Sequence, residues 1–273
     1  MLVEFRKLLA RQEFYIALLF STAIAVLGLV SIVNANYLLR SDYYPTAFQA
    51  ALVMGGDIGE LYAILLLPLL AVLPYADNYL LERKSGVHIT CLTRQGRLRY
   101  FSNKAIVIWI SAVALISISY FLNQLLCLIA FPVMRVSNMN RSGYDIYSME
   151  VFRETATNPT MLLQLNHPLL RNILHTLYAC YYGGGIALLA YMLTLYLNMN
   201  RALANVLPVI AFSVLAYVGI MVFGANGVLP CGIIYGVSYR ITSYLPMIVA
   251  IAAIYCASVV GILVKSYRSV DIL

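Results

Sequence analysis

The chain has 273 residues, of which 62% are hydrophobic and 11% are charged, and its formal net charge is +7. Soluble globular domains carry about 25% charged residues, so this composition excludes a soluble domain. Apolar runs of about 20 residues match the roughly 30 Å hydrocarbon core of a bilayer. We therefore expect an all-α integral membrane protein, because a helix satisfies its own backbone hydrogen bonds in lipid.

The N-terminal segment is basic and amphipathic. In a helix, one face would gather the apolar side chains Leu2, Phe5, Leu8 and Leu9. This pattern predicts an interfacial helix along the inner leaflet, the alternative being an ordinary polar flank of the first span. The apolar run that follows exceeds the roughly 7–15 residues of a signal-peptide core, so we expect it to be retained as a span.

Six apolar segments of sufficient length follow in the chain, each needing about 20 residues to cross a bilayer. The predicted transmembrane helices lie near residues 14–33, 58–75, 105–131, 173–197, 203–223 and 244–264. Two longer connections, 132–172 and 224–243, would lie on the side opposite the termini. The chain is then one transmembrane domain with an inner loop at residues 77–104.

The orientation follows from the distribution of basic residues. Six spans place both termini on one side, and that side would hold twelve of the eighteen Lys and Arg residues. The twelve are Arg6, Lys7, Arg11, Arg83, Lys84, Arg94, Arg97, Arg99, Lys104, Arg201, Lys265 and Arg268. We therefore predict cytoplasmic termini in a multi-pass protein of the plasma membrane. The same bias explains the basic pI without nucleic-acid binding, which we do not expect.

The sequence lacks the common patterns of catalytic and metal sites. Its five cysteines and three histidines show no metal-ligand spacing, and neither a zinc HExxH pattern nor a GxxxxGK[ST] phosphate loop occurs. We therefore expect neither a catalytic centre nor a bound metal or cofactor in this chain. Asn123 and Gln124 form the best polar pair within a span; they either hydrogen-bond a neighbouring helix, which we favour, or line a path.

The inner loop carries the most informative pattern. Its order of residues is Asp77, Glu82-Arg83, Gly86, Leu92-Thr93-Arg94, Arg97, Tyr100-Phe101 and Lys104. This order resembles the first inner loop of the ABC-2 class of ABC transporter permeases. The six spans and the amphipathic N-terminus are also similar to that family. One departure is Gln95-Gly96, where many relatives have a proline.

The resemblance implies a permease subunit of an ATP-driven exporter, without an ATPase site of its own. Its partners would be ABC ATPase subunits, which bind ATP and Mg, a second identical or similar permease copy, and membrane lipids. Residues 86–93 would form a coupling helix in a cleft of the ATPase, with Glu82 and Arg83 anchoring its entry and Arg94, Arg97 and Arg99 facing the ATPase or lipid phosphates. Glycine permits the turn at Gly86, and we expect Val87, Ile89 and Leu92 to be exposed, with Thr93 ending the coupling helix.

Other interpretations of the inner loop and of the function stay open. The inner loop could be a solvated connection without a partner. The chain could also be a membrane sensor or immunity protein that binds peptide at its outer loops without pumping. An intramembrane enzyme is disfavoured by the missing catalytic patterns. For a transporter, the apolar spans favour an amphipathic or hydrophobic cargo such as an antimicrobial peptide, a lipid or a drug.

Overall fold

The computed structural model describes residues 2–36, 46–51, 61–133, 167–197, 200–223 and 245–268, and every regular element in these ranges is a helix. This confirms the predicted all-α class. Four helices are long and apolar enough to cross a membrane, which supports a membrane protein. They are Gln12–Asn34, Arg97–Ala130, Pro168–Tyr196 and Ile248–Tyr267.

The elements follow one another with short connections wherever the structure describes them. The first half of the chain holds α1 (Leu2–Leu9), α2 (Gln12–Asn36), α3 (Ala47–Ala50), the π-helical turn η2 (Tyr62–Leu66), α5 (Leu67–Val72), α6 (Asn78–Lys84) and α7 (Val87–Gln95). The second half holds α8 (Arg97–Ala130), α11 (Pro168–Tyr196), α12 (Arg201–Phe223) and α14 (Leu245–Arg268).

The second and fifth predicted spans correspond to shorter apolar helices, Tyr62–Val72 and Ala202–Val214. The first begins next to residues 52–60, which lie outside the described part of the chain. The predicted outer connections, 132–172 and 224–243, also lie mostly outside it. Four spans are therefore supported by helix length and composition, and the count of six remains a prediction.

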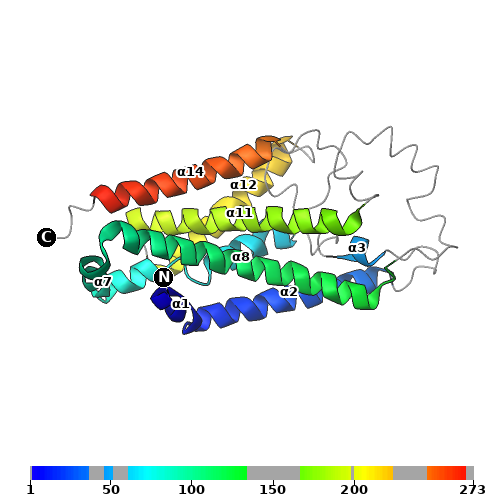
Figure 1. The fold of residues 1–273 in the computed structure, drawn as a ribbon. Helices are drawn as coiled ribbons and strands as arrows, with labels where there is room; N and C mark the ends of the chain where they lie inside the picture. Colours follow the sequence, from blue (N-terminus) through cyan, green and yellow to red (C-terminus); the bar gives the residue numbers. More distant parts are fainter. Residues whose placement is uncertain are drawn as a thin grey trace.

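The long helices lie alongside one another in an elongated bundle (Figure 1). Helix α11 is the central element, because it packs against α8, α14, α5 and α12, while α2 packs on α8. Helices α1 and α7 and the C-terminal end of α14 lie at one end of the bundle, and α3 lies towards the other end (Figure 1). Helix α1, the inner loop and the C-terminal end of α14 therefore share one end of the molecule.

Small polar side chains join α2 to α8. Ser21 Oγ lies 2.8 Å from both the carbonyl oxygen of Leu115 and the hydroxyl of Ser119. Closer to the other end, Asn123 donates to the carbonyl of Ala25 at 2.8 Å. Small residues and interhelical hydrogen bonds hold helices together in lipid, where the hydrophobic effect cannot.

Proline explains the irregular start of the shorter span. Pro68 has no N–H for the carbonyl of Ile64, four residues earlier, and the helix adopts a π turn there. Ser213 on α12 donates to this carbonyl oxygen at 2.9 Å. A side chain from a neighbouring helix thus satisfies the backbone group that proline leaves free.

The glycine triplet of α11 allows aromatic side chains to approach the helix. A Cβ atom at Gly184 would lie 2.6 Å from Nε1 of Trp109 and 2.7 Å from the hydroxyl of Tyr255. At Gly261 on α14, the nearest atom to a Cβ would be the sulfur of Met192, at 2.5 Å. Rigid rings therefore fill the space beside Gly184, whereas a flexible thioether lies closest to Gly261.

We predict that Gly184→Ala destabilises the protein by about 1–3 kcal/mol, because overpacking displaces the two aromatic rings. Gly261→Ala is the matched control, since Met192 can move and alanine favours the helix by up to about 1 kcal/mol. Thermal unfolding in detergent measures both changes. Equal midpoints for the two variants would contradict this account of the packing.

Candidate functional site

The inner loop, residues 77–104, folds into two short helices and the start of a third. Helix α6 ends at Lys84, α7 runs from Val87 to Gln95, and α8 begins at Arg97. The turns between them need glycine, because Gly86 has a φ of 72° and Gly96 a φ of 77°. The helix that we predicted at 86–93 therefore begins one residue later and ends two residues later.

Helix α7 presents apolar side chains outward at two of the three predicted positions. Val87 is 45% exposed and Ile89 is 47% exposed. The prediction of an exposed Leu92 is wrong, because this side chain is only 7% exposed and belongs to the main hydrophobic core. Leu92 lies on the face of α7 that rests on the bundle, and it attaches the helix to the rest of the protein.

The polar residues predicted around α7 are at the surface. Arg83, Thr93, Arg94 and Arg97 are all exposed, as is Arg99 on the first turn of α8. The Thr93 hydroxyl donates to the carbonyl of Thr90 at 3.0 Å, within the helix. The outer surface of α7 thus combines two apolar side chains with guanidinium groups, which is a composition common in protein interfaces.

Helices α1, α6 and α8 meet at a group of four charges, the buried Glu4, Glu82 and Lys104 and the partly exposed Lys7, which we call the charge cluster. Glu82 of α6 is its centre. One carboxylate oxygen accepts from Lys7 Nζ at 2.7 Å, and the other lies 2.8 Å from Lys104 Nζ. Tyr100 also donates to Glu82. Three side chains from two other helices therefore hold Glu82, while its role as the anchor of a coupling helix stays a prediction.

Glu4 on α1 completes the charge cluster. Its carboxylate lies 2.9 Å from Lys7 Nζ and 3.4 Å from Lys104 Nζ, and it accepts from the Tyr75 hydroxyl at 2.9 Å. Two carboxylates and two ammonium groups balance, so the cluster can be buried without net charge. Glu4 is only 3% exposed, although it is not among the residues expected on the apolar face of this helix.

The buried side chains of α1 show how it docks on the bundle, whereas its position along the inner leaflet stays a prediction. Leu8 is buried in the core, but Leu2 and Leu9 are 79% and 50% exposed. The helix therefore docks on the bundle through Glu4 and Leu8, and only part of its apolar surface is free to contact lipid. The reason is electrostatic, since the Glu4 carboxylate pairs with Lys104, which is buried in the protein, and with Lys7.

The charge cluster shifts the pKa values of its members outside the membrane spans. Burial alone would raise the pKa of Glu82, but the charge of Lys104 and the hydrogen bonds from Lys104, Lys7 and Tyr100 lower it to about 2. Burial alone would lower the pKa of Lys7, but its hydrogen bonds to Glu82 and Glu4 raise it above the usual value. Both groups are therefore charged over the whole physiological pH range.

A second ion pair stands beside the charge cluster. Arg11, between α1 and α2, donates to the Asp77 carboxylate at 3.0 Å and to the carbonyl of Pro74 at 3.3 Å. Its guanidinium carbon lies 5.3 Å from the centroid of the Tyr75 ring, a cation–π distance. The N-terminal segment is thus fixed to both ends of the turn that precedes α6.

The polar pair of α8 lies far from the inner loop along the helix. Besides the bond from Asn123 to α2, Gln124 Nε2 lies 3.4 Å from the carbonyl of Ala47, and its Oε1 accepts from Asn172 at 2.7 Å. Both side chains therefore bond neighbouring helices. In the described ranges no group of three or more His, Cys, Asp or Glu residues is placed to hold a metal ion.

Sequence reasoning missed the partners of Glu82. Membrane orientation explains both Lys7 and Lys104 in the sequence, and no local pattern pairs either lysine with Glu82. Comparison with known proteins adds no further evidence: no family model, no curated protein and no solved structure matches the chain.

We predict that Glu82→Gln lowers the stability by about 3 kcal/mol, because it leaves the buried Lys104 and the partly exposed Lys7 with one carboxylate. The control is Glu13→Gln. The Glu13 carboxylate is 32% exposed and pairs with Arg11 at 3.7 Å, so its loss costs less than about 1 kcal/mol. Thermal unfolding in detergent at about pH 7 compares the two variants.

We also predict that the difference in stability between the wild type and Glu82→Gln depends on pH. The pKa of Glu82 falls from 4.5 to about 2 on folding, so its contribution is complete above about pH 4.5 and is lost as the pH falls towards 2. The difference in unfolding midpoint between the wild type and Glu82→Gln should therefore shrink over this interval. A difference that stays constant down to about pH 2.5 would contradict the charge cluster.

Proposed function

We propose that this chain is the permease subunit of an ATP-driven ABC exporter in the bacterial cytoplasmic membrane. In this proposal it has six spans and cytoplasmic termini, and α7 is the coupling helix that a separate ATPase subunit receives in a cleft. The cargo is an amphipathic or hydrophobic compound such as an antimicrobial peptide, a lipid or a drug. The observation that supports the proposal best is α7 itself: a short helix between two glycine turns that presents Val87 and Ile89 outward over a buried ionic base.

A coupling helix must stay attached to the spans that it moves. Leu92 and the charge cluster supply this attachment, because they join α7 and α6 to α8 and α1 through buried groups. Movement of α7 would then shift these elements together rather than bend the loop. The ordered base distinguishes this loop from a solvated connection, which would need no buried contacts.

Helix α8 is well suited to carry such a movement. It begins directly after Gly96 and continues for 34 residues, which corresponds to a length of about 50 Å. This exceeds the roughly 30 Å hydrocarbon core, so one rigid helix would connect the ATPase surface to the opposite face of the membrane. At its far part it bonds α2 through Asn123.

In this proposal ATP and Mg are bound by the partner ATPase, and this chain contributes no catalytic residue. ATP-driven closure of two ATPase subunits would press on two α7 helices and rock the spans of two permease copies. The inner ends of the first, second and fifth spans would line the path between the copies. This chain then provides the conformational change and the cargo path, while the partner provides the energy.

The test is affinity purification of the full chain from its own cells in mild detergent. We predict that an ATPase of unrelated sequence copurifies at one per permease and that the combined substitution Val87→Glu with Ile89→Glu releases it. The control is Lys84→Glu, which changes the charge by the same amount at an exposed residue outside α7. The control should retain the ATPase.

Two results would overturn the proposal. One is a purified particle that contains no ATPase although the chain is intact and folded. The other is release of the ATPase by Lys84→Glu and by the double substitution alike, since general charge repulsion would then explain the loss. The unfolding midpoint of each variant separates loss of binding from loss of the fold.

A further inference from the structure

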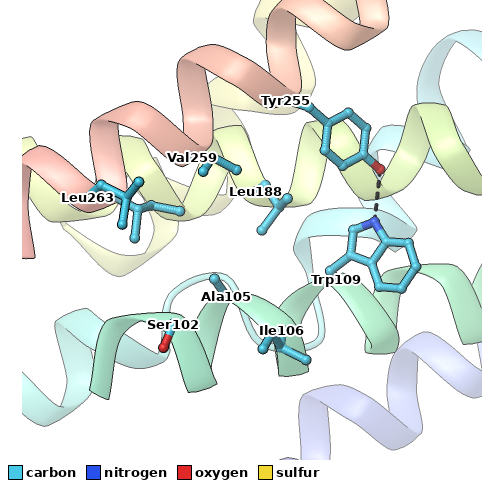
Figure 2. Close-up of a pocket in the computed structure, with 9 residues that line it drawn as sticks. Ser102, Ala105, Ile106, Trp109, Leu188, Tyr255, Val259 and Leu263 are labelled. Atoms are coloured by element: carbon cyan, nitrogen blue, oxygen red, sulfur yellow. Dashed lines mark hydrogen bonds between the residues drawn. The ribbon is translucent and has the colours of Figure 1, made fainter. Parts of the chain in front are cut away.

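A groove opens between α8 and α14 near the end of the bundle that carries α7. Its volume is about 300 Å³, and its walls are the four α8 residues Ser102, Ala105, Ile106 and Trp109, Leu188 of α11, and the four α14 residues Tyr255, Val259, Ile262 and Leu263. This volume is at the lower end of the range for small-molecule sites. Figure 2 shows α8 and α14 as its two sides, with Leu188 between them.

A hydrogen-bonded aromatic pair forms one end of the groove. Trp109 Nε1 donates to the Tyr255 hydroxyl at 2.8 Å (Figure 2), and this hydroxyl donates in turn to the carbonyl of Tyr181 at 2.8 Å. Gly184 leaves the space that the two rings occupy. With these polar atoms bonded to one another, the groove offers its occupant an almost wholly apolar surface.

The groove opens sideways within a membrane-spanning part of the molecule. Ile106 and Leu263 are each 41% exposed, and Val259 is 45% exposed, on helices long and apolar enough to cross a bilayer. From Ser102 to Trp109 the groove extends about 10 Å along α8, at 1.5 Å per residue. These dimensions suit one hydrocarbon chain that enters from the surrounding lipid.

The mouth of the groove is positively charged. Arg99 lies one turn before Ser102 on the same face of α8, and Lys265 lies one turn beyond Ile262 on α14. Lys265 Nζ is 5.7 Å from the centroid of the Tyr196 ring, at the end of α11. The three helices that form the groove, α8, α11 and α14, contain no Asp or Glu, so none of their own side chains neutralises these two cations.

We infer that this groove binds an anionic phospholipid of the surrounding bilayer, with one acyl chain against Ile106 and Val259 and the phosphate between Arg99 and Lys265. Basic residues at helix ends are the usual partners of anionic headgroups. A second copy of this chain fits the groove less well, because a twofold contact would bring the same Arg99 and Lys265 of the other copy to the same place. The inference does not depend on a transport function.

The test measures lipid binding to the full chain by native mass spectrometry in detergent, with phosphatidylglycerol and phosphatidylcholine of identical acyl chains. We predict that phosphatidylglycerol binds more tightly. Arg99→Gln with Lys265→Gln should weaken it about thirtyfold and abolish the preference, since each cation near an anionic lipid contributes about fivefold. Lys84→Glu, at an exposed residue of α6, changes the charge by the same amount and should leave both affinities unchanged.

A second pair of variants tests the hydrocarbon chain. Val259→Phe fills the groove, whereas Val260→Phe places the same ring at a neighbouring exposed position that does not line it. Only the first should weaken phosphatidylglycerol binding, by at least tenfold. If Val259→Phe fails to fold, the variant Arg99→Gln with Lys265→Gln alone tests the inference.

Three outcomes would overturn the inference. The first is equal affinity of the wild type for the two lipids, and the second is unchanged phosphatidylglycerol binding by the charge variant. The third is efficient disulfide formation between two copies carrying Val259→Cys in membranes, because a protein contact would then cover the groove. Any of these results leaves the proposed docking of α7 on an ATPase unaffected.

Discussion

The bidentate pairing of Glu82 with Lys7 and Lys104 is the interaction on which the inner end of the molecule depends. A carboxylate this deeply buried is tolerable only while both ammonium groups and the Tyr100 hydroxyl stay in place. Three helices, α1, α6 and α8, must therefore converge at one point. A buried ionic group often adds no more stability than apolar packing would, but its strict geometry fixes how the three helices meet.

This geometry has a consequence for α7, which carries the exposed apolar surface. The helix is bounded by two turns that only glycine adopts easily, at Gly86 and Gly96, yet Leu92 anchors it in the hydrophobic core. The charge cluster joins the two neighbouring helices, α6 and α8. Flexible turns alone would let a partner move the loop without moving the spans. Because α8 follows Gly96 directly and also contains Lys104, a force on α7 reaches a long helix through buried contacts rather than through a hinge.

Much of this arrangement could be predicted from the sequence, and the failures have a common cause. The turn at Gly86 and the all-helical class follow from local properties of the sequence, namely the presence of a glycine and the length of the apolar runs. The burial of Leu92 and Glu4 depends on which side of a short helix meets the bundle, and helical periodicity does not identify that side. The pairing of Lys7 with Glu82 joins residues 75 positions apart, and a single sequence carries no sign of such a contact.

The basic residues of the inner loop, first interpreted together as a sign of membrane orientation, have three different environments. Lys104 is buried and neutralised by Glu82 and Glu4. Arg94 on α7 and Arg97 at the start of α8 are exposed, and Arg99 lies one turn before the groove residue Ser102, on a different face of α8 from Lys104. A count of basic residues treats these charges as equivalent, but the side chains differ in their exposure to solvent. Only the cations without a buried carboxylate keep an external field, and these are the ones available to a protein partner or to a phosphate.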